Sequence, residues 1–347
     1  MTVTAPHLRL DSIDEYLGPA ERRFFGTGYR RASHHVSEVR VLPDGGADQV
    51  VTARVTIGYP GDWSRKKDEI DVPPHVSSID TLVLGLQLAE AHLAHGYRLG
   101  PEQRRAARLR RITLIAGGTP QEELADLPAS ARLRGTRPLP EAPGARVSVY
   151  ECRIGVMRAR YEIAHAAPAG SGRPTGFPRL EDALGPAGTR YYGAGFALRG
   201  QRLADVTVDT AQLSARASVL MEQPGAMPDG VEGATTPVFS PVDCFVSCLQ
   251  LAQVLMYEMD GIRRSDSNTL WMLRTSLDTT RPRVPVESGS RYPVRTEVTA
   301  SHLLPLRGRS WRNTEISGEL AGIRLRCSLA HALPEKTETT DAPARTP

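Results

Sequence analysis

Three features that would narrow the function of this chain at once are missing from its sequence: paired cysteines, membrane-length apolar runs and familiar catalytic motifs. The four cysteines in 347 residues form no CxxC pair, so neither a zinc site nor a disulfide framework is predicted. No apolar run reaches the ~20 residues that a membrane-spanning helix needs. The patterns GxGxxG, Walker A and GxSxG are also absent. We therefore expect no metal, no cofactor and no membrane segment.

Charge and composition exclude two further classes. A chain with 40% apolar and 24% charged residues is typical of a folded globular protein rather than a disordered one. A net charge of +4 is mild for a nucleic-acid-binding protein, so no nucleic acid partner is expected. The first residues, MTVTAPHLRLDS, contain neither a basic nor an apolar leader segment. We expect a cytoplasmic enzyme or binding protein.

What the sequence does contain is an unusual apolar segment, and it contains it twice. Residues 77–94, SSIDTLVLGLQLAEAHLA, and residues 240–257, SPVDCFVSCLQLAQVLMY, each carry an Asp near the start and a Gln seven residues later. Apolar residues occupy most of the circumference of either segment when it is drawn as a helix. This pattern predicts two helices that are surrounded by protein.

Two further pairs of segments repeat at nearly the same separation. Residues 17–29, LGPAERRFFGTGY, align with 184–196, LGPAGTRYYGAGF, at a shift of 167, and the helices align at a shift of 163. Near the ends, RARYEIAHA at 158–166 aligns with RLRCSLAHA at 324–332 at a shift of 166. Because the order and the spacing are preserved together, the chain is interpreted as two fused copies of one unit.

The duplication suggests domain boundaries. We predict an N-terminal repeat over residues 1–168 and a C-terminal repeat over 179–335. The segment between them, residues 169–178, lies within APAGSGRPTGFP and is predicted to be a linker because it is rich in Gly and Pro. The polar residues 336–347 are predicted to be a disordered tail.

The order of elements within each copy predicts the fold class. Alternating runs such as SEVRVL and RITLIAG flank the predicted helix on both sides and indicate strands. A buried helix wrapped by an antiparallel sheet is the hot-dog arrangement. We therefore predict an α+β fold, a tandem-duplicated double hot dog with pseudo-two-fold symmetry. A pair of ordinary α+β sandwiches is the competing arrangement.

The paired polar residues on the helices are the first candidate site. Asp80 and Gln87, like Asp243 and Gln250, are seven residues apart, which places each pair on one helix face within about 20°. A carboxylate near a helix N-terminus beside free backbone N–H groups suits a general base next to an oxyanion site, and an apolar pocket raises its pKa. The alternative is structural: the Asp caps the helix and the Gln bridges to a strand.

His75 is the best-placed lone histidine, because it precedes the first helix in DVPPHVSSID. Its counterpart in the second copy is Val238. Such loss of symmetry is expected if one copy keeps the chemistry, so His75 is a candidate acid or base. A surface-loop histidine is the alternative. His165 and His331 repeat in both copies, which favours a structural role.

Arginines and tyrosines supply candidate substrate-binding residues. Arg104, Arg105 and Arg108 lie in a dense basic cluster after the first helix. Such a cluster either forms a solvated face or holds a phosphate or an acidic carrier protein. Tyr191 could orient a polyol through its hydroxyl, although paired aromatics more often belong to a core.

At this point the residues resemble a known family. LDSIDEYLGPAERRFFGTGYRR at 10–31 and SPVDCFVSCLQLAQVLMYEMDGIRRSDSNTLWMLR at 240–274 are similar to the avirulence protein D family of plant-pathogenic pseudomonads and streptomycete butenolide gene clusters. The resemblance implies condensation of a β-ketoacyl thioester, carried on an acyl carrier protein, with a pentulose or pentulose phosphate. The product would be a butenolide precursor of a secondary metabolite, such as syringolide-type or methylenomycin-type antibiotics.

The candidate site residues suit that chemistry in outline. Asp80 or Asp243 would act as base, Gln87 or Gln250 would hold an oxygen, and His75 would assist dehydration. A double-hot-dog dehydratase or thioesterase acting on carrier-bound acyl chains is the nearest enzymatic alternative, and a non-catalytic ligand-binding module is the other. A monomer or a homodimer is expected, since the fusion already supplies the pairing of two units.

Overall fold

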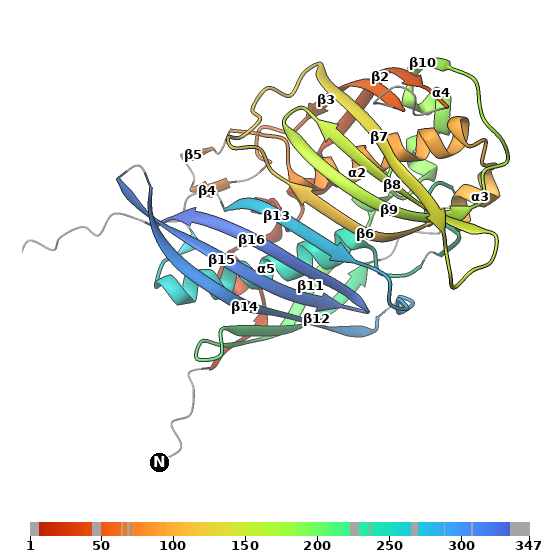
Figure 1. The fold of residues 1–347 in the computed structure, drawn as a ribbon. Helices are drawn as coiled ribbons and strands as arrows, with labels where there is room; N and C mark the ends of the chain where they lie inside the picture. The colour runs from red at the N-terminus through yellow and green to blue at the C-terminus, as the bar shows by residue number, and fades with distance from the viewer. Residues whose placement is uncertain are drawn as a thin grey trace, which may run out of the picture.

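The computed structural model describes residues 7–43, 50–63, 65–67, 70–71, 73–222, 229–235, 237–264, 270–287, 289–306 and 308–333. Two long helices and one large antiparallel sheet dominate it (Figure 1). The coarse prediction of an α+β fold is confirmed. No helix among these residues has the length and apolar character that crossing a membrane requires. The predicted tail, residues 336–347, lies outside the described residues.

The two predicted helices are α2 (Ser78–Ala91) and α5 (Pro241–Asp260). Both begin with a capping box, in which the N-cap serine and the aspartate three residues later bond each other's backbone N–H groups. All residues of α2 are buried, as are Pro241–Ala252 of α5. The sequence pattern predicted two helices surrounded by protein, and the burial of α2 and of most of α5 confirms it. Helix α2 runs on into a π-helical turn, η3 (His92–Gly96).

The strands of each half follow the predicted alternating runs. In the first half they are β2 (Ser33–Val41), β3 (Val51–Gly58), β6 (Arg108–Ile115), β7 (Leu127–Pro138), β8 (Ala145–Ile154) and β9 (Met157–Ala166). In the second half they are β11 (Gly200–Asp209), β12 (Ser214–Glu222), β13 (Trp271–Asp278), β14 (Arg291–Leu306), β15 (Arg309–Leu320) and β16 (Ile323–Ala332). Two short strands, β4 (Arg65–Lys67) and β5 (Ile70–Asp71), form a separate ribbon.

Short helices connect these elements. The α-helical ones are α1 (Asp14–Leu17), α3 (Pro101–Ala106) and α4 (Leu180–Leu184). The 3₁₀ turns are η1 (Ala20–Arg22), η2 (Gly28–Arg31), η4 (Ala187–Thr189), η5 (Gly195–Leu198) and η6 (Gly233–Thr235).

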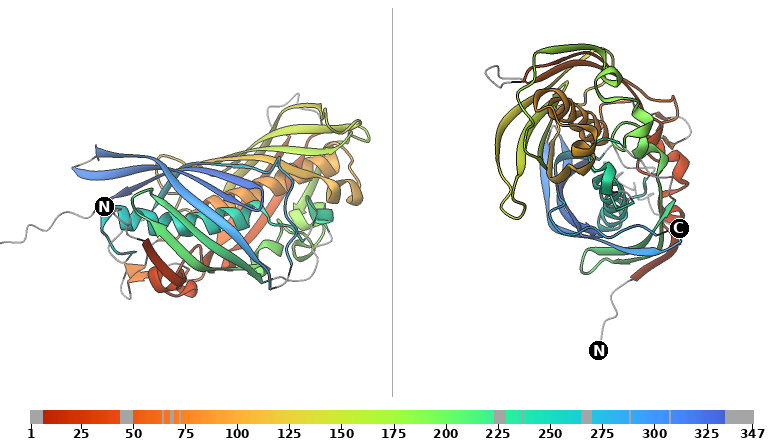
Figure 2. Two further views of the ribbon diagram at one scale, coloured as in Figure 1. Left: turned by 90° about the horizontal axis from the view of Figure 1, so that it is seen from below. Right: turned by 90° about the vertical axis from the view of Figure 1, so that its right-hand side faces the viewer.

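The strand order of the 14-stranded sheet is a palindrome with respect to the two copies. It reads β1-β11-β12-β14-β15-β16-β13-β6-β9-β8-β7-β3-β2-β10, so equivalent strands lie at equal distances from the centre. At the centre, β13 and β6 pair antiparallel, and Ser276 lies opposite its own sequence counterpart Thr113. The pseudo-two-fold axis therefore passes through this pair. The sheet curves round both helices and encloses them (Figure 2).

The first strand of each copy lies on the other half. Strand β1 (His7–Ser12) pairs with β11 of the second half, and its equivalent β10 (Thr175–Arg179) pairs with β2 of the first half. The predicted linker, residues 169–178, therefore includes the first four residues of a strand. The sheet's two outermost positions are filled by exchange, which ties the halves together at both edges as well as at the centre.

Candidate functional site

The start of α2 is built around a buried carboxylate. Asp80 accepts hydrogen bonds from the Ser77 backbone N–H at 2.8 Å and the Ser77 hydroxyl at 2.6 Å, both through Oδ2. The Tyr59 hydroxyl donates to the same oxygen, and His34 Nε2 lies 2.8 Å from Oδ1. Helix, strand β2 and the segment after β3 are therefore joined at this carboxylate. The capping alternative raised by the sequence describes its geometry.

The pKa of Asp80 moves against the sequence-based expectation, which was that an apolar pocket raises it. Burial does raise the pKa of this carboxyl, but hydrogen bonds from His34, Ser77 and Tyr59 outweigh burial, and the pKa lies below its ordinary value. The expectation was wrong because the surroundings of Asp80 are apolar along the helix but rich in donors at its first turn. A carboxylate held this way is firmly ionised and is a weak base.

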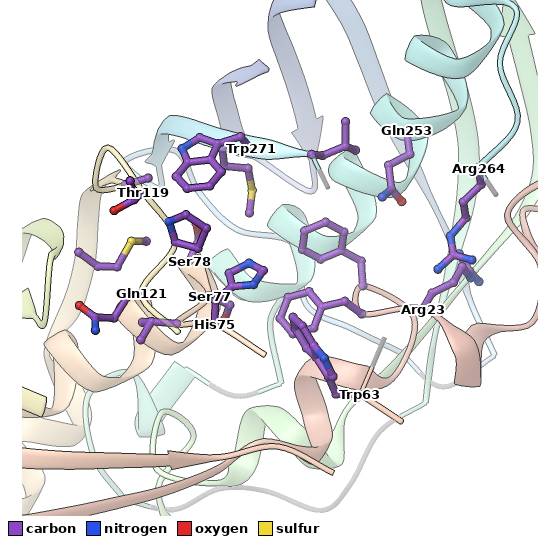
Figure 3. Close-up of a pocket in the computed structure, with 18 residues that line it drawn as sticks. Arg23, Trp63, His75, Ser77, Ser78, Thr119, Gln121, Gln253, Arg264 and Trp271 are labelled. Atoms are coloured by element: carbon purple, nitrogen blue, oxygen red, sulfur yellow. The ribbon is translucent and has the colours of Figure 1, made fainter. Parts of the chain in front are cut away.

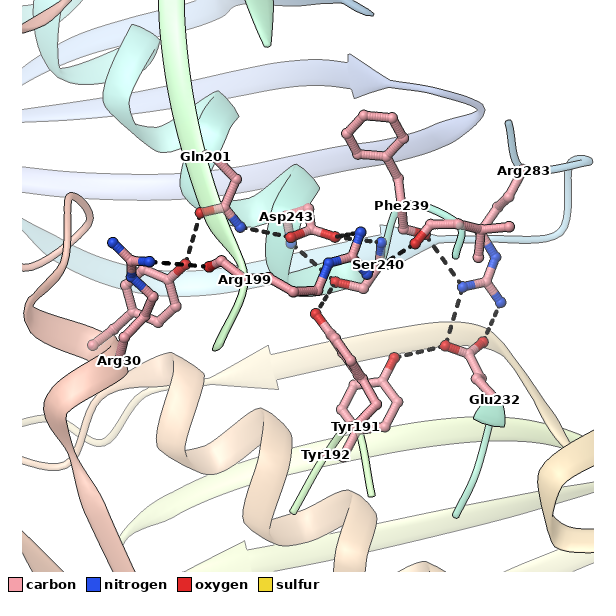
Figure 4. Close-up of polar contacts among 12 residues, drawn as sticks. Arg30, Tyr191, Tyr192, Arg199, Gln201, Glu232, Phe239, Ser240, Asp243 and Arg283 are labelled. Carbon is pink, nitrogen blue, oxygen red and sulfur yellow. Dashed lines mark hydrogen bonds and ion pairs between the residues drawn. The ribbon is translucent and has the colours of Figure 1, made fainter. Parts of the chain in front are cut away.

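The start of α5 repeats this design with different partners (Figure 4). Asp243 accepts from the Ser240 backbone N–H at 2.8 Å and from Gln201 Nε2 at 2.6 Å. Gln201 is the sequence counterpart of His34. Arg199 lies 3.4 Å from the same carboxylate, and Asp243 is fully buried. The partners of the Asp243 carboxylate are therefore all protein groups.

Gln87 and Gln250 each bind an arginine from the other half. Arg190 Nη1 donates to Gln87 Oε1 at 3.1 Å, and Arg23 Nη1 donates to Gln250 Oε1 at 2.7 Å. These are the identical arginines of the two LGPA segments. Both glutamines are buried. The sequence predicted that Gln87 and Gln250 contact the substrate. In the structure, each instead accepts a hydrogen bond that holds an LGPA segment against the helix of the opposite half.

A cavity of about 120 Å³ lies between the start of α2 and the middle of α5 (Figure 3). Its apolar wall is made mostly of aromatic and methionine side chains, and it consists of Phe24, Phe25, Trp63, Val76, Ala116, Pro120, Met157, Leu270, Trp271 and Met272. Its polar lining is Arg23, His75, Ser77, Ser78, Thr119, Gln121, Gln253 and Arg264. Both copies contribute, since the start of α2 comes from the first and Gln253 and β13 from the second. The cavity is thus a site at the junction of the two halves.

His75 lines this cavity beside the helix start. Its Nδ1 lies 3.2 Å from the carbonyl oxygen of Pro73. A carbonyl oxygen only accepts, so Nδ1 carries a proton in this bond, and in the neutral form of the ring Nε2 is the acceptor. The ring stands edge-on to Trp63, with centroids 5.4 Å apart. Ser78 also lines the cavity, and backbone N–H groups in the first turn of a helix have no acceptor within it.

The equivalent position in the second half is filled. The counterparts of the cavity-lining Phe25, Val76 and Pro120 are Tyr192, Phe239 and Arg283. Between them lies Glu232, which accepts from the Tyr192 hydroxyl at 2.7 Å and forms an ion pair with Arg283 (Figure 4). The Leu109 backbone N–H donates to Glu232 at 3.0 Å. The Glu232 side chain therefore fills the pseudo-symmetric site.

The remaining predicted residues lie away from the cavity. The Tyr191 hydroxyl bonds the Ser240 hydroxyl at the second, filled position. Arg104 Nε lies 3.6 Å from the buried Glu90, and Arg105 pairs with Glu102 on the surface. Arg108 begins β6 and is exposed. No cluster of potential metal ligands occurs among the residues that the structure describes.

A family model described as Pseudomonas avirulence D protein (AvrD) matches residues 8–334, nearly the whole chain. The chain belongs to the AvrD family. The match includes both LGPA segments, both capped helices and the cavity, so these features lie within the family domain of this AvrD-family chain. A comparison with curated proteins gave no match.

Solved structures similar to the AvrD-family chain include a tesB protein from Mycobacterium avium subs paratuberculosis, at 11% identity and a TM-score of 0.36, covering 83% of this chain and 95% of that one. An acyl-ACP thioesterase from Bacteroides thetaiotaomicron has 9% identity and a TM-score of 0.35, covering 88% and 99%. A protein with a hot dog fold from Alicyclobacillus acidocaldarius has 11% identity and a TM-score of 0.33, covering 82% and 93%. With TM-scores below 0.5, the fold rests on its own strand order and register.

Sequence reasoning missed several residues of this AvrD-family chain, and four of them bear directly on the open cavity and the helix start beside it. They are His34 and Tyr59, which hold Asp80, and Gln253 and Trp271, which line the cavity. The only available signal was the pair His34 and Gln201, a substitution between the copies that parallels the change from His75 to Val238. Both histidines stand in the first copy, where the cavity is open.

Proposed function

We propose that the scaffold is a double hot dog and that the cavity beside α2 condenses a β-ketoacyl thioester with a pentulose or pentulose phosphate. The palindromic strand order, with one enclosed helix in each half, supports this description of the fold. Membership of the AvrD family supports an enzyme that acts on acyl thioesters. The observation that carries the proposal is the open, mostly apolar cavity with a histidine and a helix N-terminus at its wall.

The residues suggest a division of labour in the first step. His75 Nε2 accepts the proton of a sugar hydroxyl while that oxygen attacks the thioester carbon. The thioester oxygen becomes negative and is stabilised by the Ser78 backbone N–H and the positive end of the helix. The C–S bond then breaks, and His75 returns the proton to the departing thiolate. Asp80 touches no reacting atom in this scheme; it holds the helix start in place.

Ring closure follows from the product of the first step. The carbon between the two carbonyls of the new ester is acidic, and His75, now neutral again, removes its proton. The resulting carbanion attacks the ketone of the sugar and closes the ring. The alkoxide takes up the proton, and elimination of water gives the butenolide. The aromatic wall of the cavity excludes bulk water, which disfavours hydrolysis of the thioester.

The test separates this reaction from its nearest rivals. The protein is incubated with a β-ketoacyl thioester of an acyl carrier protein, with and without a pentulose, and free carrier thiol and product mass are measured. The proposal predicts thiol release only when the sugar is present, together with a product that contains both carbon skeletons less water. Thiol release without sugar would indicate a thioesterase. Loss of water from the acyl chain alone would indicate a dehydratase, and binding without turnover a ligand-binding module.

A further inference from the structure

The outer face of the sheet carries a row of residues whose charges differ between the two halves. Residues that lie directly opposite one another on neighbouring strands have Cβ atoms about 4.5–5.5 Å apart. Across β13, β6, β9, β8 and β7, which lie side by side in Figure 1, one such row is Arg274, Ile115, Arg158, Arg153 and Ser130. We name it the arginine row. All three of its charges are positive.

The second half contains the pseudo-symmetric row, which serves as an internal reference. Across β6, β13, β16, β15 and β14 it consists of Arg111, Asp278, Arg324, Glu319 and Arg295. We name it the alternating row, because every arginine has an acid beside it. Arg111 lies 3.3 Å from Asp278, and Arg324 lies 3.8 Å from Glu319. In the arginine row, Ile115 stands in place of Asp278 and Arg153 in place of Glu319.

The arginine row is electrostatically unfavourable by itself. Arg153 and Arg158 are directly opposite, and like charges in that position destabilise a sheet. Among the described residues, no carboxylate pairs with Arg153, Arg158 or Arg274. The single acid nearby, Glu151, is bound by Arg134 at 2.6 Å and by Arg160 at 3.1 Å. An anion seated on the row would relieve this repulsion.

A hollow of about 380 Å³ lies over this row. Its lining is six arginines and one acid, together with small and apolar residues: Thr113, Ile115, Ser130, Arg132, Arg134, Glu151, Cys152, Arg153, Arg158, Ala159, Arg160 and Arg274. Guanidinium groups are planar and bind phosphate oxygens through two parallel N–H donors. The size and the charge of the hollow therefore fit a phosphate group.

The hollow adjoins the cavity at the ends of three strands. Ile115 lines the hollow and Ala116 the cavity; Arg158 lines the hollow and Met157 the cavity. On β13, Arg274 lines the hollow and Met272 lines the cavity. The end of β6 and the starts of β9 and β13 are therefore the place where a ligand with a phosphate on the outer face would have to turn its arm toward the interior.

We propose that the arginine row binds the phosphate of a pantetheine-type arm, whose thioester end enters the cavity. The inference rests on the proposed function, since an acyl thioester carried by coenzyme A or by a carrier protein has its phosphate at the far end of that arm. It assigns substrate recognition to Arg153, Arg158 and Arg274 in place of the basic cluster at Arg104, Arg105 and Arg108. One row of the duplicated sheet would bind the phosphate, while in the other row every arginine has an acid beside it.

The test converts one row into the other. The double variant Ile115→Asp/Arg153→Glu reproduces the charges of the alternating row at four of its five positions, with Ser130 where that row has Arg295, so it is expected to fold as stably as the native protein. Binding of 4′-phosphopantetheine, measured by calorimetry at low salt, should weaken by about 10-fold or more, because charge-assisted hydrogen bonds are lost. Arg326→Glu, an exposed position on β16 equivalent to Arg160, is the matched control and should bind like the native protein.

The remaining outcomes decide between sources of the phosphate. Pantetheine without phosphate should bind the native protein weakly and should not distinguish it from the double variant. Unchanged binding of 4′-phosphopantetheine by the double variant would overturn the inference. The inference would also be overturned if the double variant lost affinity only for a pentulose phosphate, or only for an intact acidic carrier protein. Because binding is measured without turnover, the inference survives if the condensation reaction fails, and it fails independently if the variant keeps native affinity.

Discussion

At the scale of single residues, the first half of the chain divides helix capping and proton transfer between two side chains. The sequence suggested Asp80 for either role. Asp80 is saturated by donors and ionised, which suits it to holding the helix start. His75 lines the cavity, and its Nδ1 is bonded to a carbonyl oxygen while Nε2 takes no part in that bond. The proton-transfer role therefore belongs to His75 in our account, and the positioning role to Asp80.

Replacing His75 should stop the reaction without unfolding the protein. We expect His75→Gln to lower the rate of sugar-dependent thiol release by about 100-fold or more, the usual contribution of a positioned acid or base. His302→Gln, an exposed histidine on β14, is the control and should keep the native rate. A His75→Gln protein with a native rate would remove histidine from the mechanism.

Replacing Asp80 should change stability in a pH-dependent manner. Because its folded pKa lies below the unfolded value, the carboxylate stabilises the fold above pH ~4, and this contribution is lost as the pH falls through the folded pKa. Urea unfolding of Asp80→Asn at pH 7 should show a loss of about 1–3 kcal/mol. The difference from the native protein should shrink below pH ~4.

Asp126→Asn, at an exposed position, is the matched control and should be neutral at both pH values. If Asp80→Asn has the stability of the native protein at pH 7 but no activity, Asp80 is a catalytic base and our division of roles is wrong.

At the scale of elements, the two helices are fixed by contacts that cross between the halves. Each LGPA segment sends its arginine to the glutamine of the opposite helix, so the start of one repeat is anchored on the core of the other. These glutamines stabilise the junction that forms the cavity wall, but they do not line the cavity themselves.

Removing either glutamine should therefore affect stability and spare catalysis. Gln87→Leu and Gln250→Leu should each lower the free energy of unfolding by about 1–3 kcal/mol, because a buried guanidinium loses its acceptor. The KM for the acyl thioester should be unchanged. Gln212→Leu, at an exposed position, is the control. A raised KM with native stability would instead mean that these glutamines contact the substrate, as the sequence analysis predicted.

The elements differ in how far the sequence predicts them. The two enclosed helices and most strands follow from apolar periodicity, and both capping boxes follow from Ser77 with Asp80 and Ser240 with Asp243. The strand exchange does not follow, because TGFPR in β10 lacks any alternation and sits in a Gly/Pro-rich stretch.

The candidate site was predicted in part. Loss of symmetry at His75 pointed to the cavity side of the molecule. The carboxylate's partner could not be found, since His34 precedes Asp80 by 46 residues and pairs with it only through tertiary packing. The sequence also could not predict that Glu232 fills the second site, because the residues around it show neither helix nor strand periodicity.

At the scale of the whole molecule, exchange of β1 and β10 and the central β6–β13 pairing join the halves at three places in the sheet. Such halves should unfold as one unit. A protein that keeps only Trp63 and one that keeps only Trp311, with the other tryptophans changed to Phe, report on the first and second half respectively. Their urea unfolding midpoints, followed by fluorescence, should coincide with each other and with loss of circular dichroism. Two separated transitions would show independent domains.

The central claim is that only one of two pseudo-symmetric positions is open for an acyl thioester among the described residues, and that it is the one beside His75. A crystal structure with a stable amide analogue of the β-ketoacyl phosphopantetheine thioester tests this most directly. The account predicts an acyl chain between Phe25 and Trp271, with the amide carbonyl at the start of α2. An analogue bound beside Glu232 and Arg283, or away from both helix starts, would contradict it.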